Sequence, residues 1–256
     1  MASLNKIGFV SSQNPIAKKS LSILRKKYKF SDPSRADVIV VLGGDGTVLN
    51  YLHKYLKKKI PIYGMNRGHI GFLMNEYSEK KLIERLNSSI PTKLYPLKIR
   101  CFNKDGKIRE SIAFNDVSMI RDSRQIAKIS VTINNQTKIE QLLCDGCLIS
   151  TPAGSSAYNL SLRGPVIPID AQLLAITPIS PYRPRRWRGA LVPNKVKISL
   201  TAEETDKRPV RAEADFFELK KIIKLEVELD KSKYINLLFD PGHDLEDRII
   251  NEQFIF

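Results

Sequence analysis

The spacing of apolar residues changes along the chain and predicts two regions of different architecture. Before about Pro91, short and nearly continuous apolar runs alternate with amphipathic stretches. The runs are typical of buried strands, and we expect strands at residues 6–10, 36–42 and 60–64. The amphipathic stretches predict helices at residues 15–28, 47–57 and 79–86. Strands that alternate with helices favour a parallel sheet.

After about Pro91 helical periodicity becomes scarce and strand patterns dominate. Strands are expected at residues 97–103, 108–114, 117–121, 127–134, 137–143, 195–200, 210–214, 221–229 and 234–239. We therefore predict an α/β domain with a parallel sheet over residues 1–95, followed by a β-rich domain over 96–239. Segment 240–256, with a helix from Asp244, is expected to complete the first domain.

Composition excludes several classes of protein. No stretch of about 18 apolar residues is present to span a membrane, and the N-terminus does not resemble a signal peptide. The odd number of cysteines argues against a disulfide framework and favours a reducing, cytoplasmic location. Cys144 and Cys147 form a C-x-x-C, but no second pair or nearby histidine completes a zinc site, so we interpret both as strand residues.

The formal net charge of +15 has two interpretations. It suits binding of nucleic acid, or attraction of small polyanions such as nucleotides. The basic residues are spread along the chain, with clusters at 18–29 and 183–188, and no recognisable nucleic-acid module accompanies them. We therefore expect no nucleic acid as the main partner.

The strongest local signal is the sequence Gly-Gly-Asp-Gly at residues 43–46, between an expected buried strand and an expected helix. Adjacent glycines let backbone amides approach an anion, and the start of a helix adds unpaired N–H groups. The turn is therefore suited to phosphates, although it is neither a P-loop nor a Rossmann fingerprint. Asp45 would bind a metal, accept a proton from an attacking hydroxyl, or simply cap the helix.

Three further segments carry candidate chemistry. Residues 64–73 follow a strand and contain Phe72, which offers a ring for a base to stack on or simply enters the core. Asn115 and Asp116 interrupt an apolar stretch, which alone indicates a turn. In residues 144–168, Asp145 stands at the start of an apolar strand. A hydroxyl-rich turn follows, which either binds ribose and phosphate groups or caps a helix.

These four segments, in this order, resemble the NAD kinase family. That family combines Gly-Gly-Asp-Gly, Asn-x-Gly-x-x-Gly-Phe-Leu, Asn-Asp/Glu, and Asp-Gly followed by Thr-Pro-x-Gly-Ser-x-Ala-Tyr. The chain carries them at residues 43–46, 66–73, 115–116 and 145–158. The resemblance implies an α/β domain, a β-rich domain and an active site between them. It also implies ATP or polyphosphate as phosphate donor, NAD as acceptor, Mg²⁺ or another divalent metal, and a homodimer or homotetramer.

The resemblance assigns roles residue by residue. Asp45 would be the catalytic base for the 2′-hydroxyl of the adenosine ribose, and Phe72 would pack against adenine. Asp145 would lie near a base or the nicotinamide, often across a subunit contact, and Thr177 at the rim. The other implied nucleotide-binding residues are Gly43, Gly44 and Gly46 for phosphates, Asn115 and Asp116 for hydroxyl or amide groups, and Ala153, Ser156, Ala157, Tyr158, Asn159, Leu160 and Ser161 along the ligand.

Three positions depart from the family pattern. Ala153 stands where many relatives carry Thr or Ser, and Arg163 where glycine is common. Residues 215–217 read Asp-Phe-Phe in place of Asp-Gly-Gln, which leaves the role of this segment open. The basic cluster 183–188 either helps to bind the triphosphate of the donor or is a solvated surface feature. Diacylglycerol-type lipid kinases share the Gly-Gly-Asp-Gly turn and are the alternative enzyme class. In our preferred interpretation, an NAD kinase, we expect no membrane partner.

Overall fold

A computed structural model describes residues 6–68 and 71–242. The chain divides into two compact units, one up to Leu94 and again from Lys233, the other spanning Tyr95–Ser232. The expected closing helix from Asp244 lies outside the described residues. In the described part no helix is long and apolar enough to cross a bilayer.

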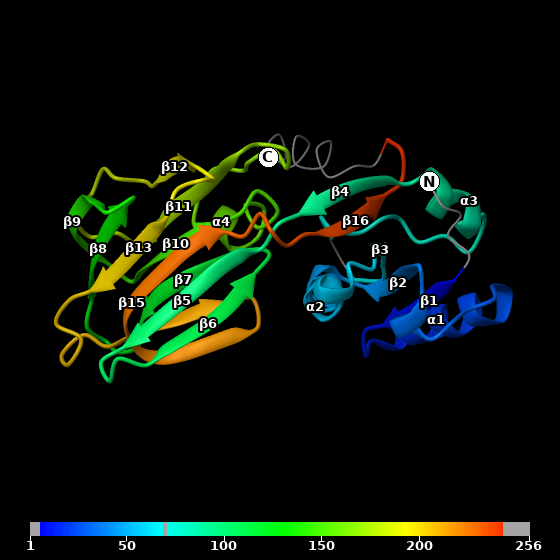
Figure 1. The fold of residues 1–256 in the computed structure, drawn as a ribbon, viewed down its shortest axis with the longest axis horizontal. Coiled ribbons are helices and arrows are strands. Elements are labelled where there is room, and N and C mark those ends of the chain that lie inside the picture. The colour runs from blue at the N-terminus through cyan, green and yellow to red at the C-terminus, as the bar shows by residue number, and fades with distance from the viewer. Residues whose placement is uncertain (1–5, 69–70, 243–256) are drawn as a thin grey trace. The chain divides into compact units, whose positions relative to one another are not determined.

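The first unit is an α/β structure built on a five-stranded sheet of order β1-β2-β3-β16-β4 (Figure 1). Its elements are β1 (Ile7–Ser11), α1 (Pro15–Lys27), the 3₁₀ helix η1 (Pro33–Arg35), β2 (Val38–Gly43), α2 (Asp45–Tyr55), the 3₁₀ helix η2 (Leu56–Lys58), β3 (Ile62–Asn66), α3 (Leu82–Ser88), β4 (Ile90–Leu94) and β16 (Ile235–Phe239). Strands β1, β2, β3 and β16 run parallel, whereas β4 is antiparallel to β16. The sheet is therefore mixed rather than purely parallel.

Helices cover both faces of this sheet. Helix α1 begins where Asn14 Oδ1 accepts a hydrogen bond from Ile16 N (2.8 Å), with Pro15 in the first turn. Its Ala17 and Leu24 pack with residues from α3 and from alternate positions of β1, β2 and β3. Helix α2 lies on the opposite face. In β3, Tyr63 and Met65 point toward α1, so Gly64 between them faces the other side of the sheet, and Val48 of α2 lies against Gly64.

The second unit is an antiparallel β structure without long helices among its described residues. Its sheet runs β12-β11-β10-β7-β14-β15-β13-β8-β9, and β5 pairs with both β15 and β6. The elements are β5 (Leu97–Asn103), β6 (Ile108–Ala113), β7 (Asp116–Arg121), β8 (Ala127–Ile133), β9 (Gln136–Cys144), β10 (Gly146–Ser150), α4 (Tyr158–Ser161), β11 (Leu173–Ile179), β12 (Ala190–Pro193), β13 (Ile198–Ala202), β14 (Val210–Ala214) and β15 (Phe217–Leu229). Alternate residues of these strands form one hydrophobic core, as Leu97, Ile99 and Cys101 of β5 illustrate.

The two-domain architecture agrees with the fold class expected from the sequence, with two differences. The pattern did not indicate β4, β11 or β12. It also placed residues 234–239 in the β-rich domain, whereas β16 pairs with β3 and β4 in the first sheet. The physical reason is that β16 pairs with strands far away in sequence, while its own apolar run is compatible with either sheet.

Because β16 is an interior strand of the first sheet, truncating its core side chain should destabilise the fold. Phe239 is fully buried, and we expect Phe239→Ala to lower the free energy of unfolding by about 3–5 kcal/mol. The matched change Phe30→Ala removes a ring that is 50% exposed and should cost about 1 kcal/mol or less. Urea denaturation measures both, and equal losses would contradict the placement of β16.

Candidate active site

The Gly-Gly-Asp-Gly turn lies between β2 and α2, at the carboxyl end of a central parallel strand. Ligands of open α/β sheets bind at this edge. Gly44 is the N-cap of α2 in an extended conformation and makes no side-chain cap, so the first amides of the helix are not capped by a side chain. A Cβ atom at Gly44 or Gly46 would meet nothing within 4 Å, whereas one at Gly43 would collide with Thr47. The structure thus requires glycine at Gly43 for packing, while the space beside Gly44 and Gly46 is open.

The carboxylate of Asp45 is held by backbone amides from another loop. Phe72 N donates to Oδ2 (2.8 Å) and Leu73 N donates to Oδ1 (2.9 Å). The side chain therefore does not occupy the N-cap position, contrary to the capping interpretation of this residue. The two N–H groups fix the plane of the carboxylate, the kind of group that can accept a proton from an attacking hydroxyl.

The loop that holds Asp45 is tied to the same edge of the sheet. Arg67 N donates to Gly43 O (2.7 Å), and Asn66 Oδ1 accepts from Gly68 N (2.8 Å). The Arg67 guanidinium lies over the Tyr77 ring and donates to Ser20 Oγ (2.7 Å). Beside this loop is an open pocket of about 440 Å³, lined by Ile16, Asn66, Arg67, Gly68, Glu76 and Tyr77. The first two sequence motifs therefore come together in the first unit.

In the second unit the structure brings the third and fourth motifs together. Asp116 of β7 is paired with Ser150 of β10, and Thr151 donates to Asn115 O through N (2.9 Å) and through Oγ1 (3.1 Å). A Cβ atom at Gly154 would lie 2.2 Å from the same Asn115 oxygen. Glycine is required there because the hydroxyl-rich turn packs directly on the Asn115 backbone.

Asp116 is a titratable group with a strongly altered proton affinity. Burial, and secondarily the charge of Asp215, raise the pKa of Asp116 to about 7. Asp215, in the turn between β14 and β15, accepts hydrogen bonds from Phe114 N (2.7 Å) and Asn115 N (3.2 Å). The segment whose role the sequence left open thus braces the Asn115-Asp116 backbone through Asp215. In the sequence, this segment stood out only as the counterpart of the Asp-Gly-Gln of the family pattern.

Charged residues that carry no sequence motif surround the remaining site residues. Arg121 Nε donates to Asp145 Oδ1 (2.6 Å), and Arg211 Nε donates to Glu213 Oε1 (2.5 Å). Burial, then the charges of Glu213, Asp116 and Asp145, raise the pKa of Tyr158. Asp116, Asp145 and Tyr158 therefore lie within one electrostatic environment. Sequence reasoning missed Arg121, Arg211 and Glu213 because charged residues at the solvent-facing positions of strands are common.

The hydroxyl-rich turn contains both accessible and buried residues. Asn159 and Thr177 are fully buried, and Thr177 Oγ1 donates to Asn159 Oδ1 (2.6 Å). Asn159 Nδ2 donates to Ser155 O (3.2 Å) and Pro165 O (2.9 Å). Thr177 thus does not lie at a rim as expected, since both side chains are used to hold the turn. Ala153 and Ser156 are also buried, Ala157 and Leu160 are half-buried, and Tyr158 and Ser161 are exposed.

The cysteines are structural. Cys101, Cys144 and Cys147 are free and buried. Burial raises the pKa of Cys101 to about 11 and that of Cys144 to about 12, and it raises the pKa of Cys147 as well. Protonated, inaccessible thiols are poor metal ligands and nucleophiles, which agrees with the interpretation of the C-x-x-C as strand residues.

The turn, its anchored carboxylate and the two-domain fold are features of a phosphate-binding enzyme, and comparison with known proteins identifies the family. Residues 2–91 match the ATP-NAD kinase N-terminal domain, and residues 105–236 match the ATP-NAD kinase C-terminal domain. The chain therefore belongs to the NAD kinase family.

Related proteins match over nearly the whole chain. The chain is 44% identical to an NAD kinase of Caulobacter vibrioides over 98% of its length and 96% of the relative. It is 45% identical to an NAD kinase of Mesorhizobium japonicum, over 98% and 97% of the two chains. Its fold is similar to yeast NADH kinase complexed with NADH (TM-score 0.82, 19% identity, 98% and 87% covered). It is also similar to an Archaeoglobus fulgidus NAD kinase in complex with ATP (TM-score 0.72, 21% identity, 96% and 98% covered).

The raised pKa of Asp116 predicts a pH-dependent cost to stability. The unfolded chain ionises this group above about pH 4, whereas the folded chain keeps it protonated up to about pH 7, so stability falls across that window. Asp116→Asn removes this cost. We expect the variant to gain about 1–3 kcal/mol over the wild type at pH 8 and little at pH 4.5. Urea unfolding at both pH values measures the difference, and a gain independent of pH would contradict the assignment.

The open space at Gly44 predicts a separation of stability from activity. Gly44→Ala introduces a methyl group that meets no neighbour in the structure, so the melting temperature should stay within a few degrees of the wild type. If phosphates approach the turn, the same methyl group should raise KM for the nucleotide by about tenfold or more, equivalent to about 1.4 kcal/mol. Steady-state kinetics with unchanged KM would show that no ligand lies against Gly44.

Proposed function

We propose that this chain is an NAD kinase that transfers the γ-phosphate of ATP to the 2′-hydroxyl of the adenosine ribose of NAD, giving NADP. The observation that carries the proposal is the anchored Asp45 carboxylate at the start of α2, beside an open glycine turn, in a chain whose two halves both match ATP-NAD kinase domains. Polyphosphate is the alternative donor. ATP is favoured by the family description and by the Archaeoglobus fulgidus relative complexed with it.

The mechanism follows from the position of Asp45. The ribose 2′-hydroxyl attacks the γ-phosphorus in line, a new P–O bond forms, and the bond to the ADP oxygen breaks. Asp45 accepts the hydroxyl proton as this occurs, and ADP leaves with the bonding electron pair. Gly43, Gly44 and Gly46 present the turn to the phosphates, and Phe72 offers its ring to the adenine. The protein thus acts mainly by positioning the reacting groups.

A divalent metal fits this site only in company with the nucleotide. Among residues 6–68 and 71–242 no group of three or more His, Cys, Asp or Glu side chains is arranged to hold a metal ion. Mg²⁺ commonly binds through one or two carboxylates together with substrate phosphates. When bound, the metal would neutralise phosphate charge, and the Asp45 carboxylate beside the turn would attract it without giving up its role as base.

We assign the NAD-binding surface of the second unit to the third and fourth motifs. Its support is the common electrostatic environment of Asp116, Asp145 and Tyr158. Asn159 and Thr177 contribute by holding the turn, because their polar groups bond each other and the backbone. The other proposed contacts are Asn115, Ala153, Ser156, Ala157, Leu160 and Ser161.

The competing functions predict different partners. A lipid kinase would co-sediment with anionic vesicles, and a nucleic-acid binder would shift DNA or RNA in a gel at physiological salt. Membership of the NAD kinase family in both halves of the chain favours the nucleotide kinase. We further propose a cytoplasmic homodimer or homotetramer, in keeping with the family resemblance and the free cysteines.

The role of Asp45 predicts the behaviour of Asp45→Asn. The amide keeps the size of the side chain but cannot accept the proton, so kcat should fall by about 10²- to 10⁴-fold while the protein remains folded. NADP formation from NAD, ATP and Mg²⁺, coupled to an NADP-specific dehydrogenase, measures the loss. Circular dichroism controls for folding, and near-normal turnover by the variant would exclude Asp45 as the base.

A further inference from the structure

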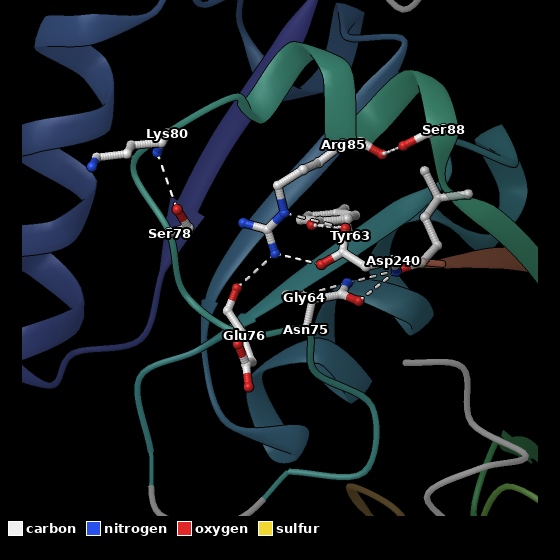
Figure 2. Close-up of polar contacts among 10 residues, drawn as sticks. Tyr63, Gly64, Asn75, Glu76, Ser78, Lys80, Arg85, Ser88 and Asp240 are labelled. Atoms are coloured by element: carbon white, nitrogen blue, oxygen red, sulfur yellow. Dashed lines mark hydrogen bonds and ion pairs between the residues drawn. The ribbon is translucent and has the colours of Figure 1, made fainter. Parts of the chain in front are cut away.

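The loop that holds Asp45 ends at a largely buried polar cluster made of Tyr63, Asn75, Arg85 and Asp240. Figure 2 shows Tyr63, Asn75 and Arg85 converging on Asp240, with Arg85 carried by α3. Tyr63 and Asn75 are fully buried, and Asp240 is only 9% exposed. Hydrogen-bonded groups at this depth hold fixed positions, because breaking any of their bonds leaves a polar group without a partner.

Asn75 ends the loop that supplies the two amides to Asp45. Its backbone forms a parallel bridge to Met65: Asn75 N donates to Gly64 O (2.8 Å), and Asn66 N donates to Asn75 O (2.9 Å). Its side chain donates to Gly64 O (3.1 Å) and Leu238 O (2.9 Å), and accepts from Asp240 N (2.8 Å). Asn75 is therefore fixed to β3 and to the end of β16 at once.

Arg85 and Asp240 fix the next residue of the chain. Tyr63 Oη donates to Asp240 Oδ1 (2.7 Å), and Arg85 makes an ion pair with the same carboxylate through Nε and Nη2. Arg85 Nη2 also donates to Glu76 O (2.8 Å). Burial and the Asp240 hydrogen bond raise the pKa of Tyr63, which keeps the phenol a donor. Residues 75 and 76 are thus held from two sides.

We propose that this cluster positions the catalytic base. Phe72 and Leu73, whose amides hold both oxygens of Asp45, lie only two or three residues before Asn75. The 72–73 amides can keep Asp45 in one orientation only if the loop end is itself immobile. Gly71 allows the tight approach, since a Cβ atom there would lie 3.0 Å from Asp45 Oδ1 and 2.5 Å from Met74 Cγ. Asn75, Arg85 and Asp240 are positioning residues in this arrangement, and the proposal rests on Asp45 being the base.

The test uses Asn75→Leu and Arg85→Met in the full-length protein. Leu has a similar volume but makes none of the three side-chain hydrogen bonds, and Met loses the bonds to Asp240 and Glu76. We expect kcat to fall by roughly 10- to 100-fold with KM for NAD within about twofold of the wild type, because misplacement of a reacting group by about 1 Å costs up to about 10²-fold. Arg85→Lys, which keeps the charge opposite Asp240, should retain more turnover than Arg85→Met. If Asn75→Leu does not fold, the comparison of Arg85→Met with Arg85→Lys carries the test.

Two controls separate positioning from simple loss of stability. Leu86→Ala truncates the neighbouring buried residue of α3 and should lower the melting temperature without changing the cluster. When assayed at a temperature where it is folded, this variant should have the kcat of the wild type. In an Asp45→Asn background, the cluster substitutions should lower the residual rate by less than about twofold, since they act through Asp45.

Three results would overturn the proposal. One is a fall in kcat for Leu86→Ala as large as that of the cluster variants. Another is a further fall of roughly 10- to 100-fold in the residual rate when the cluster substitutions are added to Asp45→Asn. The third is normal kcat in both cluster variants while Asp45→Asn is inactive, which would leave the proposed function intact. Full turnover by Asp45→Asn alone would instead remove the base assignment, and this inference with it.

Discussion

The arrangement of the candidate site depends on one carboxylate held by two backbone amides. Asp45 is the first residue of α2, where the helix dipole favours a negative charge, and its oxygens receive hydrogen bonds from Phe72 N and Leu73 N. A carboxylate beside phosphates is repelled by them, so its orientation has to be imposed by the protein. The amides supply that orientation, and the bridge between Met65 and Asn75 fixes the end of the loop that carries them.

A second constraint operates in the β-rich unit, where backbone segments approach too closely for side chains. Gly154 packs against Asn115 O, and a Cβ atom at Gly146 would lie 2.5 Å from Met119 O. The first contact holds the hydroxyl-rich turn against the start of β7, where Asp116 is desolvated, and the second holds β10 against β7. Burial of this acidic group costs free energy at this point. Such costs are commonly concentrated at sites that bind ligands.

Much of the fold could be predicted from local pattern. Helix α1 and strands β2 and β5 occupy nearly the predicted residues, because each carries a clear apolar period. The pairing of β16 with β3 and β4 could not be predicted, because it joins segments far apart in sequence. The motifs located the Asp45 turn, but the partners of Thr177 and Asp215 depend on tertiary contacts. Sequence alone therefore could not separate residues that face a ligand from those that hold the turn.

The most direct test of the account is the product of a single turnover. Wild-type protein in excess over NAD is mixed with ATP and Mg²⁺, and the phosphorylated product is identified by its reduction with an NADP-specific dehydrogenase and by the position of its phosphate in ³¹P NMR. The account predicts conversion of bound NAD to NADP with the new phosphate on the adenosine 2′-oxygen. A folded protein that forms no NADP with ATP or polyphosphate, or that phosphorylates diacylglycerol in vesicles instead, would contradict it.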